Sequence, residues 1–192
     1  MTLRIAFVPG ATPDKWARHW RERFREPLEL LPVEEADVRA LLEDGGVDMA
    51  VARLPVPGAG EDLHCVHLYE ELPVVVVPTE HVVAGFDEVS AADLADEQFP
   101  LGVPSGVPSR MDQLPFGPMT VKDAIEVAAS GTGVVVVPMS VARLHHRKDV
   151  THAVVTDLPT TQMALLWPKD RDDERTQAFV GVVRGRTARS SR

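Results

Sequence analysis

The chain has 192 residues, of which one, Cys65, is a cysteine and 5% are aromatic. A single cysteine excludes an internal disulfide and a metal site built from several thiolates, so a reducing compartment such as the cytoplasm suits the protein. No apolar run approaches the ~20 residues that a membrane-spanning helix needs. The first residues also lack the basic segment and the long apolar segment of a secretory signal. We therefore expect a cytoplasmic protein without a membrane anchor.

Basic residues are in the minority, with 20 Lys and Arg against 29 Asp and Glu and a formal net charge of −9. A broad nucleic-acid-binding surface needs clustered Lys and Arg, so this charge argues against one. Hydrophobic residues make up 44% of the chain, which is enough for a substantial core. The length fits one domain or two small ones.

The stretch Val38–Pro55 organises the first half of the chain. Its first residues have helical apolar spacing, and Gly45 follows them at the position where a left-handed residue commonly ends a helix. Residues 47–52 are nearly all apolar, as in a parallel strand that is covered on both faces. Such a strand delivers Arg53 and Pro55 to the carboxyl edge of a sheet, where open α/β sheets bind ligands.

The residues before this stretch complete a βαβαβ pattern, which implies right-handed crossovers and parallel strands. The first helix is expected to begin with Thr12 as its N-cap and to bury Trp16, Trp20 and Phe24, which are spaced four residues apart. The expected strands and helices of this half are strands 3–8, 28–33 and 47–52, a helix to about residue 25, and a helix over 34–44.

The second half mixes short strands and helices. The expected strands are 63–69, 72–77, 99–103, 134–137, 153–156 and 163–167. The expected helices begin at Ser90, with a capping box, at Thr120, with a capping box and an end at Gly131, at Ser140 and at Arg171. Residues 105–118 are rich in proline and are expected to be irregular.

Two extended crossings, near residues 74–79 and 151–156, divide this pattern into two lobes. We expect a discontinuous lobe I over residues 1–78 and 152–192 and a lobe II over residues 79–151. A cleft between lobes is a common ligand site. The tail after Gly185 carries Arg186, Arg189 and Arg192, which with Arg184 form a basic run that we expect to fray without a specific role.

Five segments in this order resemble the effector-binding domain of LysR-type transcriptional regulators. They are LRIAFVPG, LLEDGGVDMAVARLP, LYEELPVVVVPTEH, SAADLADE and SGTGVVVVP, and the resemblance covers roughly residues 2–184. It implies an α/β, two-lobed fold of the type 2 periplasmic-binding-protein kind, with mixed, mainly parallel sheets. It also implies a small effector bound in the cleft between the lobes, and a homodimer.

Two features depart from the family pattern. LysR-type regulators carry a winged helix-turn-helix before this domain, whereas this chain opens directly on the first strand, so direct DNA binding by this chain alone is not expected. The chain is then either a stand-alone sensor or a fragment of a longer protein. Residues 102–121 are also shorter than the usual second lobe, so we expect that lobe to be reduced.

Two segments of lobe I are candidate ligand contacts. The turn Gly10-Ala11-Thr12 could offer N–H groups and a hydroxyl to an anion, or could be an ordinary helix cap. Arg53 could grip a carboxylate with its guanidinium, or could be a solvated side chain that pairs with a nearby acid. Pro55 leaves the same strand end.

Five residues of lobe II complete the predicted site. Thr79 and His81 follow the first crossing, although a lone histidine there is more often a surface residue. Ser105 follows a proline and could donate to ligand or cap a turn. Gly131 and Thr132 belong to a glycine-containing loop that runs from helix into strand, so it is not a dinucleotide fingerprint and serves better as a C-cap that lines the cleft.

Catalytic and metal-binding patterns are poor. His64 and His67 lie three apart on an expected strand, so they face opposite sides and cannot share a metal. Cys65 has apolar surroundings that favour packing over nucleophilic chemistry. No serine lies in a nucleophile elbow. We therefore expect no cofactor, no metal and no catalytic residue.

The sequence favours a non-enzymatic sensor of a small molecule, most simply an organic anion, that acts in transcription regulation through a partner or a separate DNA-binding domain. Two alternatives stay open. Fold does not determine function, so an enzyme could use the same two-lobed fold. The second alternative is a module for interaction or dimerisation that has lost ligand binding.

Overall fold

The computed structural model describes residues 2–185, and its backbone forms two compact units. Unit 1 comprises Met1–Tyr69 and Gln162–Arg192, and unit 2 comprises Glu70–Thr161. The predicted basic tail beyond Gly185 lies outside the described residues. Within those residues, no helix is long and apolar enough to cross a bilayer.

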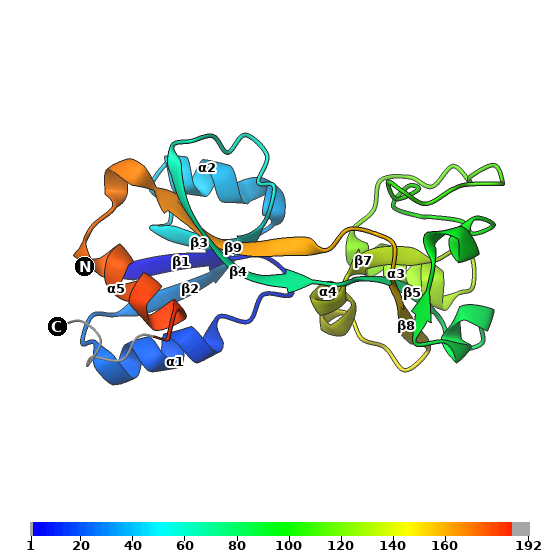
Figure 1. Ribbon diagram of the computed structural model, residues 1–192, viewed down its shortest axis with the longest axis horizontal. Coiled ribbons are helices and arrows are strands. Elements are labelled where there is room, and N and C mark those ends of the chain that lie inside the picture. Colours follow the sequence, from blue (N-terminus) through cyan, green and yellow to red (C-terminus); the bar gives the residue numbers. More distant parts are fainter. Residues whose placement is uncertain (1, 186–192) are drawn as a thin grey trace. The chain divides into compact units, whose positions relative to one another are not determined.

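Unit 1 is built on a five-stranded sheet of order β2-β1-β3-β9-β4 (Figure 1). Its elements are β1 (Leu3–Phe7), α1 (Asp14–Arg23), β2 (Leu28–Pro32), the 3-10 turn η1 (Glu35–Asp37), α2 (Val38–Glu43), β3 (Met49–Arg53), β4 (Leu63–Glu71), β9 (Thr161–Pro168), η4 (Lys169–Arg171) and α5 (Glu174–Val183). β1 pairs in parallel with β2 and with β3, so the predicted βαβαβ unit is confirmed. β9 runs antiparallel to β3, which makes the sheet mixed.

Helices cover both faces of this sheet, with α1 and α5 on one face and α2 on the other (Figure 1). The five residues of β3 are all buried, as an inner strand between two covered faces requires. Gly45 has φ +74°, so the predicted left-handed residue after α2 is confirmed. The expected single helix over 34–44 is instead a 3-10 turn followed by six α-helical residues.

Trp20 anchors α1 to the core. The residue is 1% exposed, and its ring stacks on Phe24 at a centroid distance of 4.4 Å and lies 5.9 Å from the ring of Phe179 on α5. The indole N–H is satisfied by the carbonyl oxygen of Glu26 at 2.8 Å. The predicted buried stripe is wrong at its two ends, because Trp16 is partly buried and Phe24 is 37% exposed.

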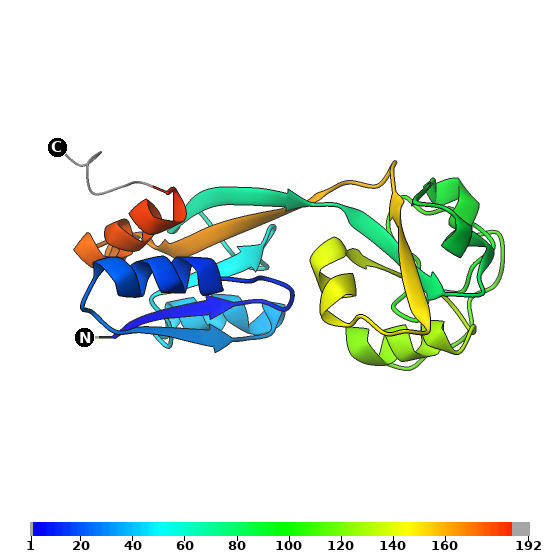
Figure 2. The ribbon, with the colours of Figure 1, turned by 90° about the horizontal axis from the view of Figure 1, so that it is seen from below.

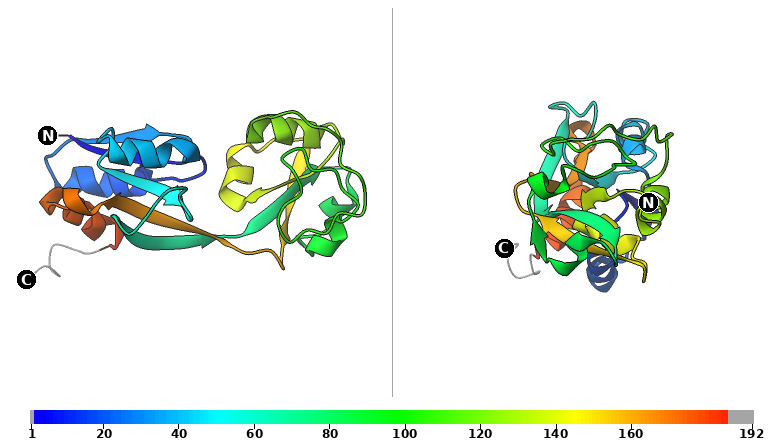
Figure 3. Two further views of the ribbon diagram at one scale, coloured as in Figure 1. Left: turned by 90° about the horizontal axis from the view of Figure 1, so that it is seen from above. Right: turned by 90° about the vertical axis from the view of Figure 1, so that its right-hand side faces the viewer.

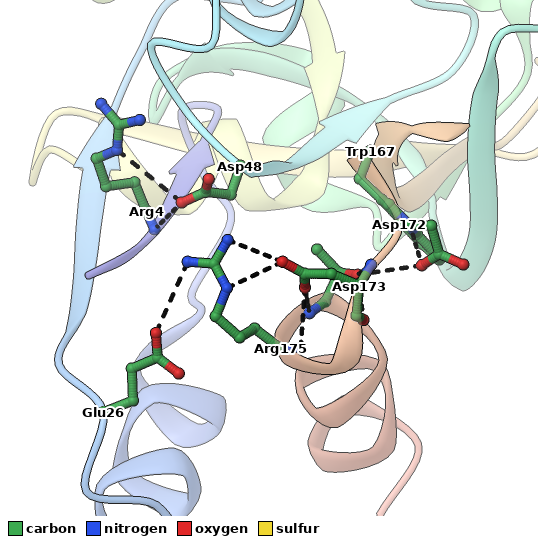
Figure 4. Close-up of polar contacts among 8 residues, drawn as sticks. Arg4, Glu26, Asp48, Trp167, Asp172, Asp173 and Arg175 are labelled. Atoms are coloured by element: carbon green, nitrogen blue, oxygen red, sulfur yellow. Dashed lines mark hydrogen bonds and ion pairs between the residues drawn. The ribbon is translucent and has the colours of Figure 1, made fainter. Parts of the chain in front are cut away.

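Charged side chains fix the start of α5 against the rest of unit 1 (Figure 4). The Asp173 carboxylate accepts hydrogen bonds from the backbone N–H groups of Arg175 and Thr176, each at 2.9 Å, and so caps the helix. The guanidinium of Arg175 binds the other oxygen of Asp173 at 2.8 Å and reaches Glu26 at 3.7 Å. Because Glu26 lies just after α1, this network links the two helices that share a face of the sheet.

Unit 2 contains a four-stranded sheet of order β6-β8-β5-β7. Its elements are β5 (Pro73–Pro78), η2 (Val82–Gly85), β6 (Glu88–Val89), η3 (Ala91–Leu94), α3 (Val121–Ala129), β7 (Val135–Pro138), α4 (Met139–Leu144) and β8 (Val150–Val155). β5 is antiparallel to both of its neighbours, and β6 is parallel to β8, so this sheet is also mixed.

The valine run of β5 supplies both cores of unit 2, one on each face of the sheet. Val74 and Val76 pack in the cluster that includes α3 and α4. Val75 and Val77 point the other way and pack in the cluster that contains the 3-10 turns and Phe99. Figures 2 and 3 show α3 and α4 on one side of this sheet and the 3-10 turns on the other.

The segment around Phe99 is not the strand that its apolar residues predict. The amide side chain of Gln113 accepts from the Phe99 N–H at 2.9 Å and donates to the Glu97 carbonyl at 3.0 Å. Side-chain amides thus satisfy backbone groups that a strand neighbour would otherwise pair. The predicted capping boxes at Ser90 and Thr120 and the irregular character of residues 105–118 are confirmed.

Candidate functional site

The carboxyl ends of β1 and β3 bring two predicted segments together. Phe7 lies opposite Val51 in the parallel pair, so the turn after β1 and the residues after β3 leave the sheet at the same edge. Gly10 has φ +87°, a conformation that favours glycine, and turns the chain towards α1. The Leu54 N–H donates to the carbonyl oxygen of Gln162 at 2.8 Å, so one connection to unit 2 also reaches this edge.

Arg53 is the buried charged group of this edge. It is 6% exposed, and its Nη1 lies 2.6 Å from Oε1 of Glu35. A buried guanidinium needs an anionic partner, because leaving it unpaired would cost several kcal/mol. The sequence offered two interpretations of Arg53, a ligand contact or a solvated side chain paired with an acid. The structure shows the pair with an acid, but the arginine is buried rather than solvated. The partner, Glu35, was missed, because η1 approaches β3 only through the crossover.

The turn that follows β1 is less available than its sequence predicts. The Ala11 N–H already donates to the Val8 carbonyl oxygen at 3.1 Å, and Ala11 is 6% exposed. Thr12 is exposed, but the prediction that it caps α1 is wrong. The N-cap residue is Pro13, whose backbone is in the helical region. The Thr12 hydroxyl therefore lies one residue before the position from which a side chain caps α1. Pro55 is exposed and follows a cis peptide bond at the same edge.

The predicted residues of unit 2 make local contacts. The Thr79 N–H donates to the Asp149 carbonyl oxygen at 3.2 Å. His81 accepts the Val83 N–H at its Nδ1 atom, 3.2 Å away, and its Nε2 lies 3.0 Å from Oε1 of Glu97. This partly buried histidine therefore positions the turn η2.

Three further candidates lie in two separate loops. Gly131 follows α3 with φ +79°, which confirms its role in ending that helix. The Thr132 hydroxyl bonds to the Ser130 hydroxyl at 2.9 Å. Ser105 is exposed in a turn that the Val107 N–H closes onto the Pro104 carbonyl oxygen at 3.1 Å.

Thr79, His81 and Thr132 lie at the end of the unit 2 sheet that is far from the two chain connections to unit 1. β8 runs antiparallel to β5, with Val74 opposite Val154 and Pro78 opposite Val150, so both connections to unit 1 attach at the Pro73 end of β5. Thr79 and His81 lie beyond the Pro78 end. Six strand residues at about 3.3 Å each put that end roughly 20 Å away. Thr132 precedes β7, which is antiparallel to β5, and so lies at this far end too.

The Pro73 end of β5 carries groups that the sequence does not single out. The Leu72 carbonyl oxygen there accepts from the Met139 N–H at 2.9 Å, at the start of α4. Leu72 is 47% exposed.

The apolar neighbours of Cys65 in the sequence predicted that it packs in the core, but it does not. It lies exposed on β4, the edge strand of its sheet. Neighbouring atoms partly desolvate the thiol and so raise its pKa, which disfavours the nucleophilic thiolate. His64, one residue before, lies 3.6 Å from Asp172 and packs on Trp167 at 4.9 Å. Among the described residues, no three His, Cys, Asp or Glu side chains are grouped as metal ligands.

A shallow groove of about 540 Å³ lies in unit 1, beside the edge strand β4. It is bounded by Trp16 of α1, by residues 65–69 and by Val183 and Arg184 at the end of α5. Arg53 and the turn after β1 do not line it.

The LysR substrate binding domain model matches residues 1–188. The chain belongs to this family. The LysR-type domain is 24% identical over 203 residues to the Hca operon transcriptional activator HcaR of Escherichia coli K12, with 97% of this chain and 68% of HcaR covered.

Solved structures of LysR-type proteins share the fold of this effector-binding domain. The BenM effector-binding domain with its effector benzoate matches at a TM-score of 0.77 and 18% identity, over 98% of this chain and 93% of that one. The reduced OxyR regulatory domain of Pseudomonas aeruginosa matches at 0.71 and 19%, over 95% of each chain. A Corynebacterium glutamicum OxyR C206 mutant matches at 0.72 and 19%, over 95% of this chain. The present domain spans 63% of that OxyR chain.

Proposed function

We propose that this LysR-type domain senses a small organic anion and that Arg53 provides the positive charge that holds it. The observation that carries this proposal is the buried guanidinium at the carboxyl edge of β1 and β3, beside the turn 10–12. An arginine fork matches a carboxylate in shape and charge, and a site with little water strengthens the attraction. The likeness to the BenM domain that holds benzoate supports the choice of carboxylates for a first test.

Ligand binding would regulate transcription by favouring one state of the domain, which requires that the effector binds the two states with different affinity. Because the net charge is −9, we assign DNA contact to a separate domain or partner. We also propose that the domain acts as a homodimer in the cytoplasm. The sharing of one effector between two lobes remains a prediction from the sequence.

A non-enzymatic role is favoured by what the reactive side chains do. The Thr120 and Ser90 hydroxyls bond to aspartates in capping boxes, and the raised pKa of Cys65 disfavours a thiolate nucleophile. His81 lies against a carboxylate and a backbone N–H, where it positions a turn. The relative HcaR is named as a transcriptional activator, which points the same way.

Isothermal titration calorimetry tests the proposed function. The domain is titrated with a panel of benzoate, other aromatic monocarboxylates and C2–C6 aliphatic mono- and dicarboxylates. We expect saturable binding of at least one member and a loss of at least tenfold in affinity for Arg53→Met, since a hydrogen bond to a charged group contributes about 1.5–3 kcal/mol.

The matched control is Arg18→Met, which removes an exposed guanidinium from α1 and should bind like the wild type. Circular dichroism checks that both variants are folded. Absence of binding across the panel, or equal affinity in folded Arg53→Met, would rule the proposed site out. Turnover of a panel member would favour the enzyme alternative.

A further inference from the structure

One side chain ties together the two strands that carry the chain out of unit 1. The chain leaves unit 1 after Tyr69 and returns to it at Gln162. These residues lie on β4 and β9, which are neighbours in the sheet (Figure 1). The side-chain amide of Gln162 donates to the carbonyl oxygen of Tyr69 at 2.9 Å, although 93 residues separate the two in the sequence. The unit 1 ends of both connections are therefore held by one amide.

Gln162 is also bonded to the sheet edge that carries Arg53. Met163 lies directly opposite Arg53 in the antiparallel pair of β9 and β3. One residue before Met163, the Gln162 carbonyl oxygen accepts the Leu54 N–H at 2.8 Å. The main chain of Gln162 thus extends from the end of β3, and its side chain extends to the end of β4. No other residue type is needed to connect the proposed anion site with both connections.

The chemistry of the amide suits this role. A glutamine side chain carries two N–H donors, and here the nitrogen donates to carbonyl oxygens of two different strands. One acceptor is Tyr69, and the other is Met163 at 2.7 Å, which fixes the direction of the side chain. The bond to Tyr69 is exposed to solvent, so it contributes little to the stability of the whole fold. Its loss should therefore be felt locally, at the strand ends that it joins.

We propose that Gln162 is a positioning residue that transmits effector binding at Arg53 to the connection that follows Tyr69. This inference rests on the proposed function and adds the route by which that site would act. A carboxylate held by Arg53 restrains the end of β3, and the bond between Leu54 and Gln162 extends the restraint to β9. The Gln162 amide extends it further to Tyr69. Without the amide, the effector still restrains β9 but no longer restrains residues 70–72.

Two substitutions separate the donor from the bulk of the side chain. Gln162→Met removes both N–H donors at nearly the same length, and Gln162→Lys supplies a donor again. Thr160→Val is the matched control, because it changes an exposed side chain of the connection that enters β9. Circular dichroism checks that each variant is folded.

The first measurement uses no effector and follows hydrogen exchange of single amides by NMR. The Leu54 N–H should exchange roughly threefold to tenfold faster in Gln162→Met, because its acceptor then lies on a less restrained strand. The amides of Ile5 and Ala6, in the buried strand β1, should exchange as in the wild type. Equal acceleration at all three amides, or none at Leu54, would overturn the proposal. Either result leaves the proposed function intact, because no effector is present.

The second measurement repeats the exchange with saturating benzoate, or with the tightest-binding carboxylate of the panel if benzoate does not bind. In the wild type and in Thr160→Val, the amides of residues 70–72 should exchange at least about threefold more slowly with ligand. Gln162→Met should bind with an affinity within about threefold of the wild type, yet show no slowing at residues 70–72. Gln162→Lys should recover the slowing.

The outcomes distinguish this inference from the proposed function. If ligand slows residues 70–72 equally in the wild type and in Gln162→Met, or slows them in neither, the transmission by Gln162 is refuted while sensing stands. If no carboxylate of the panel binds the wild type, the proposed function fails and this inference fails with it.

Discussion

The carbonyl oxygen of Gln98 accepts a hydrogen bond from the backbone N–H of Val134 at 2.8 Å. This bond brings the loop before Phe99 against the chain that enters β7, and the close approach leaves no room at Gly133. A Cβ atom at Gly133 would lie 2.7 Å from that same Gln98 oxygen and 3.0 Å from Pro100. The glycine is thus required by packing of two backbones rather than by its φ angle.

Gly133→Ala should destabilise unit 2 by about 1–3 kcal/mol, the usual cost of forcing an extra methyl group into a packed site. The measurement is urea denaturation followed by circular dichroism. Gly117→Ala is the matched control, since nothing lies within 4 Å of its added Cβ, and it should be neutral or slightly stabilising. Equal effects of the two substitutions would show that the Gln98 contact does not constrain the loop.

The hydroxyl of Thr120 caps α3, whereas that of Thr12 does not cap α1. Thr120 accepts the Asp123 N–H at 3.1 Å and donates to its carboxylate at 2.8 Å. Thr120→Ala should therefore cost about 1 kcal/mol in free energy of unfolding, and Thr12→Ala close to nothing. Urea denaturation of both variants checks this. If Thr12→Ala loses as much free energy of unfolding as Thr120→Ala, Thr12 does cap α1, as the sequence predicts.

The hydrogen bonds that the Asp172 carboxylate accepts should be sensitive to acid. Hydrogen bonds from Gln177, from the Trp167 indole and from Thr176 hold the pKa of Asp172 below its ordinary value of 3.8. Because the folded-state pKa is lowered, the stabilisation is fully present above pH 3.8 and is lost as the pH falls through the lower folded-state value. The difference in melting temperature between wild type and Asp172→Asn should thus be largest near neutral pH and shrink below pH 3.8.

Thermal melts from pH 7 to pH 2.5, followed by tryptophan fluorescence, measure that difference. Asp170→Asn, at an exposed neighbouring position, serves as the control and should follow the wild type throughout. A melting difference for Asp172→Asn that stays constant below pH 3.8 would contradict the assignment.

Local patterns predicted the elements of this fold well where one residue type decides the conformation. The glycine after α2, the capping box at Thr120 and the buried β3 all follow from backbone and burial rules that act within a few residues. The Phe99 segment was predicted wrongly, because its backbone bonds go to the Gln113 side chain, fourteen residues away. Periodicity carries no information about such a partner.

The candidate site shows the same limit. The sheet edge and the place of Arg53 on it could be predicted, since the βαβαβ pattern makes the strands parallel and brings their carboxyl ends to one edge. The Glu35 partner could not, because it depends on how the crossover places η1 against β3. On unit 2, nearness in sequence to a crossing favoured Thr79 as a ligand contact, but β5 carries Thr79 to the end of the strand opposite the connections.

Binding of the effector at Arg53 is tested most directly by a two-dimensional ¹⁵N NMR titration of the domain with the carboxylate of the panel that binds most tightly. We expect the largest shifts at the amides of Gly10, Ala11 and Thr12 and at the side-chain N–H of Arg53. Shifts concentrated at residues 65–69 beside the groove, with Arg53 and the turn 10–12 unmoved, would contradict it.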